Sequence, residues 1–388
     1  MKNIKIKFGL RPLLYLMFLM PHFTTSVLMD VAVIYAIRFL GVVAFAFLMV
    51  LLLREKRKPE KIEVLILLIT LWVIIITLIG NVMTSEILYL IYLWSSTCII
   101  SYNFISKKDS DFLTIFCILS NIYVLLNIPF MFMDNDANAY ERIYIFGGKN
   151  TLQMHFIPAI FANYIVSYIK HGKLKSSYLV FIVLDILTVI MCGASTGIFA
   201  VIAIIVFAIL SKKITINIWT YIVLFVIFLV LIFNTQRILE MDMLYDFITN
   251  TLGKDLSFTT RTDVWKYVVP NIFNNFFGYG YGNLVVYSQF SWLNEAHNMF
   301  LELLLIGGVP LLVMYCVLLY ELLKKNPNKT TNLLLAICFS FFVIGLMESI
   351  QFHSQFWILL IAYYKISNGE IGYDLSSLES GGSDEKKQ

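Results

Sequence analysis

Charged residues are scarce in this sequence, since Asp, Glu, Lys and Arg together make up 14% of its 388 residues. Aliphatic, aromatic and sulfur-containing residues make up 59%, so most of the chain cannot face water. The apolar residues fall in runs of roughly 17–25 without strict alternation, which is typical of membrane-spanning helices and not of a β-barrel. The composition therefore excludes an ordinary soluble protein and predicts an all-α polytopic membrane protein.

Residues that commonly bind metals are also few. The five cysteines lie singly within apolar runs, without metal-ligand spacing or a disulfide framework, and are expected to be small packing residues. Of two Asp-x-Asp pairs, residues 109–111 precede an apolar run as a helix cap would, and residues 134–136 form a single weak signal. We therefore expect no metal site and no cofactor.

Hydropathy predicts about twelve transmembrane helices. The expected spans are residues 10–29, 31–53, 62–79, 86–105, 111–133, 151–169, 176–192, 195–211, 214–233, 296–323, 331–348 and 352–366. Residues 1–233 would hold the first nine helices, with a polar connection at 134–150. Residues 234–295 would form a large extracytoplasmic loop with short helices, residues 296–366 the last three spans, and residues 367–388 a disordered cytoplasmic tail.

The distribution of lysine and arginine predicts the orientation. If the N-terminus is cytoplasmic, alternate connections carry 22 of the 29 basic residues. Cytoplasmic loops are enriched in these residues, so we expect an even number of spans with both termini in the cytoplasm. The apolar run near the N-terminus lacks a small-residue cleavage site and is interpreted as a retained helix.

The segment from Ser257 to Tyr315 is the most informative. It joins a polar, aromatic loop to an apolar helix that begins near His297 and Asn298. Histidine exchanges protons near neutral pH, and a wet, fixed imidazole at a helix mouth could act as a general base. The alternative is an interfacial histidine that only anchors the helix end.

Arginines in the two largest predicted outer segments are candidates for binding phosphate. The planar guanidinium of Arg142 or Arg261 would bind phosphate oxygens bidentately, with Lys149, Lys266 and Arg237 as secondary candidates. The alternative role for each is contact with lipid headgroups or a surface ion pair.

Other polar residues stand out against the apolar spans. Arg38 lies inside a span, where a charge costs roughly 2.5 kcal/mol or more, so we expect it to face the bundle interior or a wet cavity. A structural pair between Arg38 and Asp185 is the alternative. Glu302 shares a helix face with Asn298. The run from Gly278 to Gly282 is predicted to be a tight turn, with Tyr279 and Tyr281 available to stack on sugars, because it lacks the lysine and serine of a phosphate loop.

Together these motifs resemble the O-antigen polymerase and ligase superfamily. The resemblance rests on Arg261-x3-Trp265, on Phe277-Gly278-Tyr279-Gly280, and on Ala296-His297-Asn298-x-x-Leu301 followed by Gly307-Gly308. The earlier segment from Glu141-Arg142 to Gly147-Gly148-Lys149-Asn150 is similar to the superfamily's first arginine element. The turn at Ser195-Thr196-Gly197 has threonine where many members have arginine.

The resemblance implies an enzyme of the bacterial cytoplasmic membrane, similar to C-type glycosyltransferases, that inverts the sugar and needs neither nucleotide-sugar nor metal. The donor and acceptor would be glycans on undecaprenyl pyrophosphate, and a flippase and a chain-length regulator are possible partners, with no nucleic acid. His297 would activate the acceptor hydroxyl, while Arg261 and Arg142 would bind the leaving pyrophosphate. Asn298, Arg38, Lys149, Lys266, Glu302, Tyr279 and Tyr281 would contribute to substrate binding.

Three alternatives remain open beside a polymerase that builds capsule, O-antigen or exopolysaccharide. A ligase would transfer the finished glycan to another acceptor, and the sequence separates it poorly from a polymerase. A flippase or transporter would explain Arg38 and the buried acids, but gives no reason for an outer segment of about 60 residues that ends in a histidine. A scaffold or sensor would have no chemistry.

Overall fold

The computed structural model describes residues 9–25, 27–106, 111–132, 144–211, 213, 219–220, 223, 261–291, 293–325 and 329–371. These residues form helices, and the β-structure among them is one isolated bridge between Tyr144 and Gly147. The helices are α1 (Leu10–Leu19), the 3-10 turn η1 (Met20–Phe23), α2 (Val31–Arg54), α3 (Lys61–Ile79), α4 (Ser85–Phe104), α5 (Asp111–Phe132), α6 (Lys149–His171), α7 (Ser176–Met191), α8 (Ser195–Leu210), α12 (Arg261–Asn274), α13 (Val285–Gln289), α14 (Met299–Leu323), α15 (Lys329–Gly345) and α16 (Ser354–Ser367).

The helices follow the predicted spans closely. Eleven of the expected spans coincide with described helices, and the expected span 214–233 lies almost wholly outside the described residues. Six helices, α2 to α6 and α14, are long and apolar enough to cross a membrane, while α7, α8 and α15 are apolar but shorter. The chain is thus a multi-pass membrane protein, and the number of twelve spans stays a prediction.

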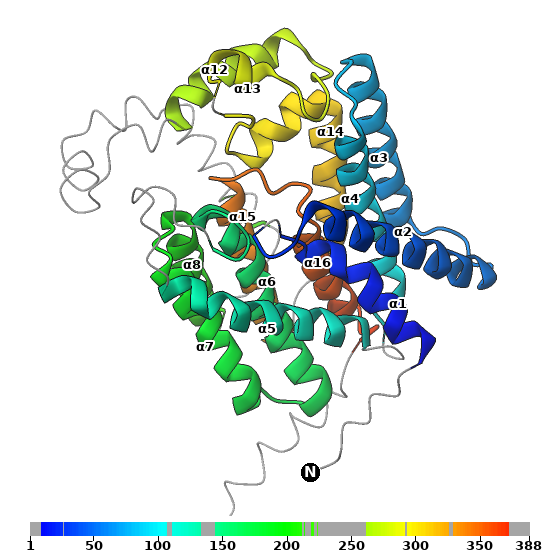
Figure 1. The fold of residues 1–388 in the computed structure, drawn as a ribbon, viewed down its shortest axis with the longest axis vertical. Coiled ribbons are helices and arrows are strands. Elements are labelled where there is room, and N and C mark those ends of the chain that lie inside the picture. Colours follow the sequence, from blue (N-terminus) through cyan, green and yellow to red (C-terminus); the bar gives the residue numbers. More distant parts are fainter. Residues whose placement is uncertain are drawn as a thin grey trace, which may run out of the picture.

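The helices form a bundle around α16 (Figure 1). Nearly every residue from Ser354 to Tyr363 is buried, and α16 packs against α4, α6, α14 and α15. By contrast, only 17% of the most apolar window of α2 is buried within the protein, although the helix is strongly apolar. An apolar helix that the protein leaves uncovered is suited to contact with lipid.

Helix α14 is broken at Gly308, whose φ of 66° and ψ of −162° are not helical. The segment 276–281 packs its backbone against the break. The amides of Tyr279 and Gly280 donate to the carbonyls of Leu305 (2.6 Å) and Ile306 (2.9 Å), and the amide of Val309 donates to Phe276 (3.0 Å). These bonds replace ones that the break removes from the helix, so the predicted tight packing of the glycine run is confirmed.

Glycine is required at this junction for steric reasons. A Cβ on Gly278, which has a φ of +86°, would lie 2.6 Å from the amide nitrogen of Gly308. A Cβ on Gly308 would collide with the carbonyl of Phe276. The two backbones approach this closely only because neither residue has a side chain.

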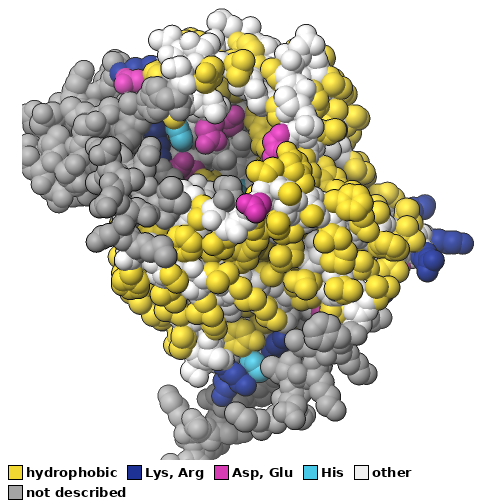
Figure 2. Space-filling model, in the orientation of Figure 1, with side chains coloured by type: hydrophobic (Ala, Val, Ile, Leu, Met, Phe, Trp, Pro, Cys, Tyr) yellow, Lys and Arg dark blue, Asp and Glu magenta, His cyan; other side chains and the backbone are white. Residues whose placement is uncertain are grey.

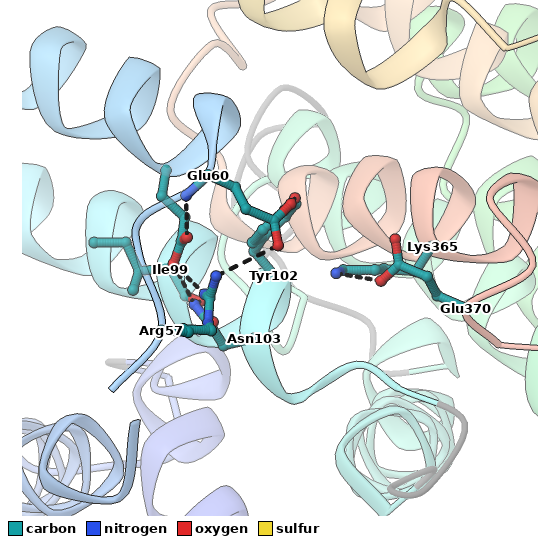
Figure 3. A network of polar contacts seen from close by, with 8 residues as sticks. Arg57, Glu60, Ile99, Tyr102, Asn103, Lys365 and Glu370 are labelled. Atoms are coloured by element: carbon teal, nitrogen blue, oxygen red, sulfur yellow. Dashed lines mark hydrogen bonds and ion pairs between the residues drawn. The ribbon is translucent and has the colours of Figure 1, made fainter. Parts of the chain in front are cut away.

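A polar network holds the bundle together where α2 joins α3 (Figure 3). The carboxylate of Glu63 accepts from Arg57 (2.6 Å), from the amide of Asn103 (2.8 Å) and from the backbone amide of Glu60 (2.9 Å). The hydroxyl of Tyr102 donates to Glu60. These bonds connect the loop between α2 and α3 to the last turn of α4.

Candidate active site

His297 lies directly before α14 in a left-handed conformation, with a φ of 48°. The residues beside it are fixed by hydrogen bonds. The backbone amide of Ala296 donates to Glu302 (2.8 Å), and the side chain of Asn298 caps α14 by accepting from the amides of Phe300 and Leu301 (both 3.0 Å). The histidine is thus held in an uncommon backbone conformation, a feature often found at functional sites.

The carboxylate of Glu348 brings His297 and Arg261 together. Oε1 of Glu348 accepts from Nη2 of Arg261 at 2.7 Å, and Oε2 lies 3.3 Å from Nδ1 of His297. The side chains of Glu348, Arg261 and His297 are 3%, 13% and 20% exposed, so the carboxylate is buried while the other two retain some access. A charge-assisted hydrogen bond between a guanidinium and a buried carboxylate is short and geometrically specific.

The spacing of Arg261 and Trp265 has a structural reason. The two residues are one turn apart on α12, so their side chains leave the helix on the same face. The indole of Trp265 donates to the carbonyl of Ala296 at 2.9 Å while Arg261 reaches Glu348. Trp265 and Ala296 are also buried in one small apolar cluster with Leu301 and Leu305. The two motifs predicted from the sequence therefore bind each other.

Glu295 adds a second carboxyl group to this site. Burial raises the pKa of Glu295 above its ordinary value; the charges of His297 and Arg261 oppose this rise, and that of Glu348 adds to it. Sequence reasoning did not assign a role to Glu295 or a partner to Glu348. The available signal was a glutamate just before the predicted span 296–323 and another at the end of the span 331–348, and it did not indicate which residue either would contact.

Asn298 and Glu302, both expected to bind substrate, are engaged within the protein. Besides capping α14, Asn298 donates to the carbonyl of Leu346 at 3.0 Å and is fully buried. Glu302 is bonded to the backbone before His297 and is 6% exposed. In the structure both residues position His297, and direct substrate contact by either stays a prediction.

The tyrosines and Lys266 lie around the same site. Tyr279 donates its hydroxyl to the carbonyl of Asn271 at 2.8 Å. The ring of Tyr281 packs edge-on against Phe352 at 5.5 Å. Lys266 is an exposed residue of α12 that forms a 3.4 Å ion pair with Asp263. The role of each in binding substrate stays a prediction.

Arg38 has a different partner from the one considered. Its guanidinium binds Glu86 of α4 bidentately, at 2.7 and 2.9 Å, and lies 4.6 Å from the ring centre of Tyr89. The alternative pair with Asp185 is therefore wrong, because α4 supplies a nearer carboxylate. Asp185 is buried in α7, and neither of its carboxyl oxygens has a hydrogen-bond partner among the described residues.

Two further predicted residues are not placed. Arg142 lies outside the described residues, as does Arg237. Lys149 begins α6, but its side chain is not described. Whether they join Arg261 at the site stays a prediction.

The molecule is hollowed on the face that Figure 2 shows, and acidic and histidine side chains gather in the hollow. The loop between α15 and α16, which carries Glu348, crosses the middle of the bundle next to α14 (Figure 1). Within the described residues no group of three or more His, Cys, Asp or Glu could hold a metal ion. The site combines an imidazole with a guanidinium, and so pairs a possible proton acceptor with an anion-binding group.

Comparison with known proteins supports this interpretation. No curated protein and no solved structure matches the chain significantly. A model of the O-antigen ligase family matches residues 180–316, which include Arg261, Trp265, the glycine run and His297. The match agrees with the resemblance that the motifs show to the O-antigen polymerase and ligase superfamily, whose members are glycosyltransferase-like enzymes.

Proposed function

We propose that the protein is a polysaccharide polymerase that joins oligosaccharide repeat units carried on undecaprenyl pyrophosphate. The observation that carries the proposal is the carboxylate of Glu348, which holds Arg261 and His297 on its two oxygens. The proximity of these two side chains supports the proposal, because glycosyl transfer from a lipid diphosphate requires a base for the acceptor hydroxyl and a cation for the leaving group.

His297 acts as the general base in this proposal. If Glu348 accepts a hydrogen bond from Nδ1–H of His297, the lone pair of the histidine lies on Nε2. Nε2 takes the proton of the acceptor hydroxyl as its oxygen attacks the anomeric carbon of the donor sugar. The bond between that carbon and the phosphate oxygen breaks, undecaprenyl pyrophosphate leaves, and the anomeric centre is inverted.

Arg261 stabilises the charge that develops on the leaving pyrophosphate. One nitrogen is bound to Glu348, while Nε has no hydrogen-bond partner among the described residues. A guanidinium with unused donors can bind phosphate oxygens, and one such donor contributes about 10²–10³ in rate in comparable sites. Arg142 would add a second positive charge to the same diphosphate.

The proposed location is the outer face of a bacterial cytoplasmic membrane, with both termini in the cytoplasm. The support is the accumulation of basic residues in alternate connections, including the one between Arg54 and Lys61. In this orientation the site faces outward, where lipid-linked repeat units would reach it without nucleotide-sugars.

A ligase is the second candidate, because the matching family is described as O-antigen ligase. The same groups would activate a hydroxyl of a different acceptor. The products distinguish the two functions: a polymerase makes a ladder of longer glycans on the lipid carrier, and a ligase moves one glycan to another molecule.

The test is a reconstituted reaction. Purified protein receives a lipid-linked repeat unit and no nucleotide, and the glycans are separated by size. We expect a ladder from the wild type and its loss, by a factor of about 10³ or more, in H297A and in R261A. The matched control is H171A, which removes a histidine from the end of α6 and should leave the ladder intact.

A ladder that persists in both H297A and R261A would exclude the assigned roles. Transbilayer movement of the lipid with unchanged glycans would instead support a flippase. Membrane insertion and thermal unfolding of each variant show whether a lost ladder reflects lost chemistry or lost folding.

A further inference from the structure

A second polar cluster lies deeper in the bundle, five residues along the chain from Glu348. It consists of His353, which directly precedes α16, Gln355 in the first turn of α16, and His155 of α6. Gln355 is 1% exposed, whereas His155 and His353 keep part of their surface accessible. Such a cluster among apolar helices needs an explanation, because buried polar groups are normally fully hydrogen-bonded.

Hydrogen bonds fix how Gln355 is oriented. Its amide nitrogen donates to the backbone carbonyl of His22 (3.1 Å), so the other atom of the amide must be the oxygen. The same nitrogen lies 2.9 Å from Nδ1 of His155, which therefore accepts, and the proton of His155 is on Nε2. The oxygen of Gln355 is left without a hydrogen-bond partner among the described residues.

His353 is incomplete in the same way. Its ring packs edge-on against His155 at 5.3 Å, and its Nδ1 is buried without a partner in the described part of the chain. The nearby His22 differs, because both of its ring nitrogens are bonded, to Ser354 and Thr97 at 3.1 Å each. The cluster thus contains two buried polar atoms, on Gln355 and His353, that lack a hydrogen-bond partner among the described residues, whereas the neighbouring His22 has both of its ring nitrogens bonded.

Aromatic rings lie beside the cluster. Phe146 stacks on His155 at 3.7 Å. Phe352, which precedes His353 in the chain, packs edge-on against Tyr281 at 5.5 Å. The short loop from Glu348 to His353 connects the cluster to the site of His297, since the amide of Ile350 donates to the carbonyl of Glu348 (3.1 Å) and the amide of His353 donates to that of Ile350 (2.9 Å). A ligand that extends from one site to the other would pass along this loop.

The chemistry of the cluster differs from that of the active site. Imidazole and carboxamide groups offer both donors and acceptors, which matches hydroxyl groups, and aromatic faces pack on the apolar faces of sugar rings. We propose that His353, Gln355 and His155 form a sugar-binding subsite that holds one neutral sugar residue of the glycan. This subsite rests on the proposed function, because it takes the glycan whose diphosphate lies at Arg261.

The test measures two ligands separately on the purified full-length protein. One probe is the repeat-unit oligosaccharide without lipid, prepared by partial hydrolysis of the cell's own surface polysaccharide. The other is undecaprenyl pyrophosphate without sugar. The key variants are H353N and H353L, which have side chains of similar size, because Asn can place a polar atom near the position of Nδ1 and Leu cannot.

We expect H353L to bind the oligosaccharide at least tenfold more weakly than wild type, H353N to stay within about threefold, and both to bind undecaprenyl pyrophosphate normally. R261A should show the reverse pattern. F146L, which removes the ring stacked on His155, provides an independent test if H353L does not fold, and should weaken oligosaccharide binding alone.

The proposal is overturned if wild type does not bind the oligosaccharide, or if H353L and F146L bind it as well as wild type does. The cluster would then hold water only. If wild type did not bind undecaprenyl pyrophosphate, or if R261A bound it as well as wild type does, the proposed function would be contradicted instead. The two failures are therefore distinguishable.

Discussion

Two charged clusters at opposite ends of α14 differ in how many of their polar groups have hydrogen-bond partners. Near the start of the helix, Glu348 holds Arg261 and His297; near its end, Lys61 and Lys324 bind Glu321, beside the network of Glu63. The 25 residues of α14 would extend roughly 36 Å as an unbroken α-helix, so the two clusters are far apart. In the second region each carboxylate named here has at least one donor within the protein, and Glu63 has three.

The region around Glu348 is less complete. Nε of Arg261 lacks a partner among the described residues, His297 has a strained backbone, and burial raises the pKa of Glu295. These features cost stability and persist in a well-packed protein when they serve another purpose. Under the proposed function, the network of Glu63 stabilises the fold, whereas the site of Glu348 receives a ligand.

The largest predicted effect is a loss of turnover on substitution of Glu348, which distinguishes it from Glu63. In E348Q the new amide can accept from only one of Arg261 and His297 and opposes the other, so turnover should fall about 10²–10³-fold. Because Glu348 acts through His297, the pH profile of turnover should change as well, and E348D should partly restore it. Chain extension by E348Q at the wild-type rate, with the same pH profile, would contradict the assigned role.

The second prediction concerns stability at the break in α14, on the side of Glu348. G308A should destabilise the protein by about 2–3 kcal/mol, because the new Cβ meets the carbonyl of Phe276 and the φ of 66° disfavours alanine. Thermal unfolding in detergent measures this loss. The control is G148A, where a Cβ would meet nothing within 4 Å and the φ of −69° is ordinary. Equal unfolding temperatures for the two variants would refute the steric argument.

Substitution of Glu63 should lower stability without lowering turnover, the reverse of the effect expected for Glu348. E63Q removes the charge that Arg57 pairs with, and should lower stability by about 1–2 kcal/mol. Turnover per folded molecule should stay at the wild-type value, because the network is at the other end of α14. A loss of turnover that exceeds the loss of folded protein would break the distinction between the two regions.

The smallest effect concerns Glu295 and depends on pH. A carboxyl whose pKa is raised in the folded state holds its proton there at pH values where the unfolded chain has released it. Stability therefore falls as pH rises from about the ordinary glutamate value through the raised one. E295Q has no carboxyl group at this position and so lacks this loss. The unfolding temperature of E295Q minus that of wild type should therefore be larger at pH 8 than at pH 4. A difference independent of pH would show that Glu295 is not perturbed in this way.

Much of the fold could be predicted locally. Runs of apolar residues such as 86–105 form helices because lipid offers no partner for backbone amides and carbonyls, and α4 follows that range closely. The motif of Arg261 and Trp265 could be recognised in the sequence, but the helical face that the two side chains share was found only in α12. The break at Gly308 was not predicted, since a glycine pair within an apolar run is compatible with a straight helix.

The sequence by itself determined the class of this protein, its apolar helices and the motifs at Arg261 and His297, since each depends on neighbours within about one turn or one membrane thickness. The partner of those residues depended on packing. Glu348 is 87 residues from Arg261 and 51 from His297 in the chain, and no periodicity connects positions so far apart. Their contact exists because α12, α14 and the loop after α15 share one buried surface, which only the folded arrangement of the helices creates.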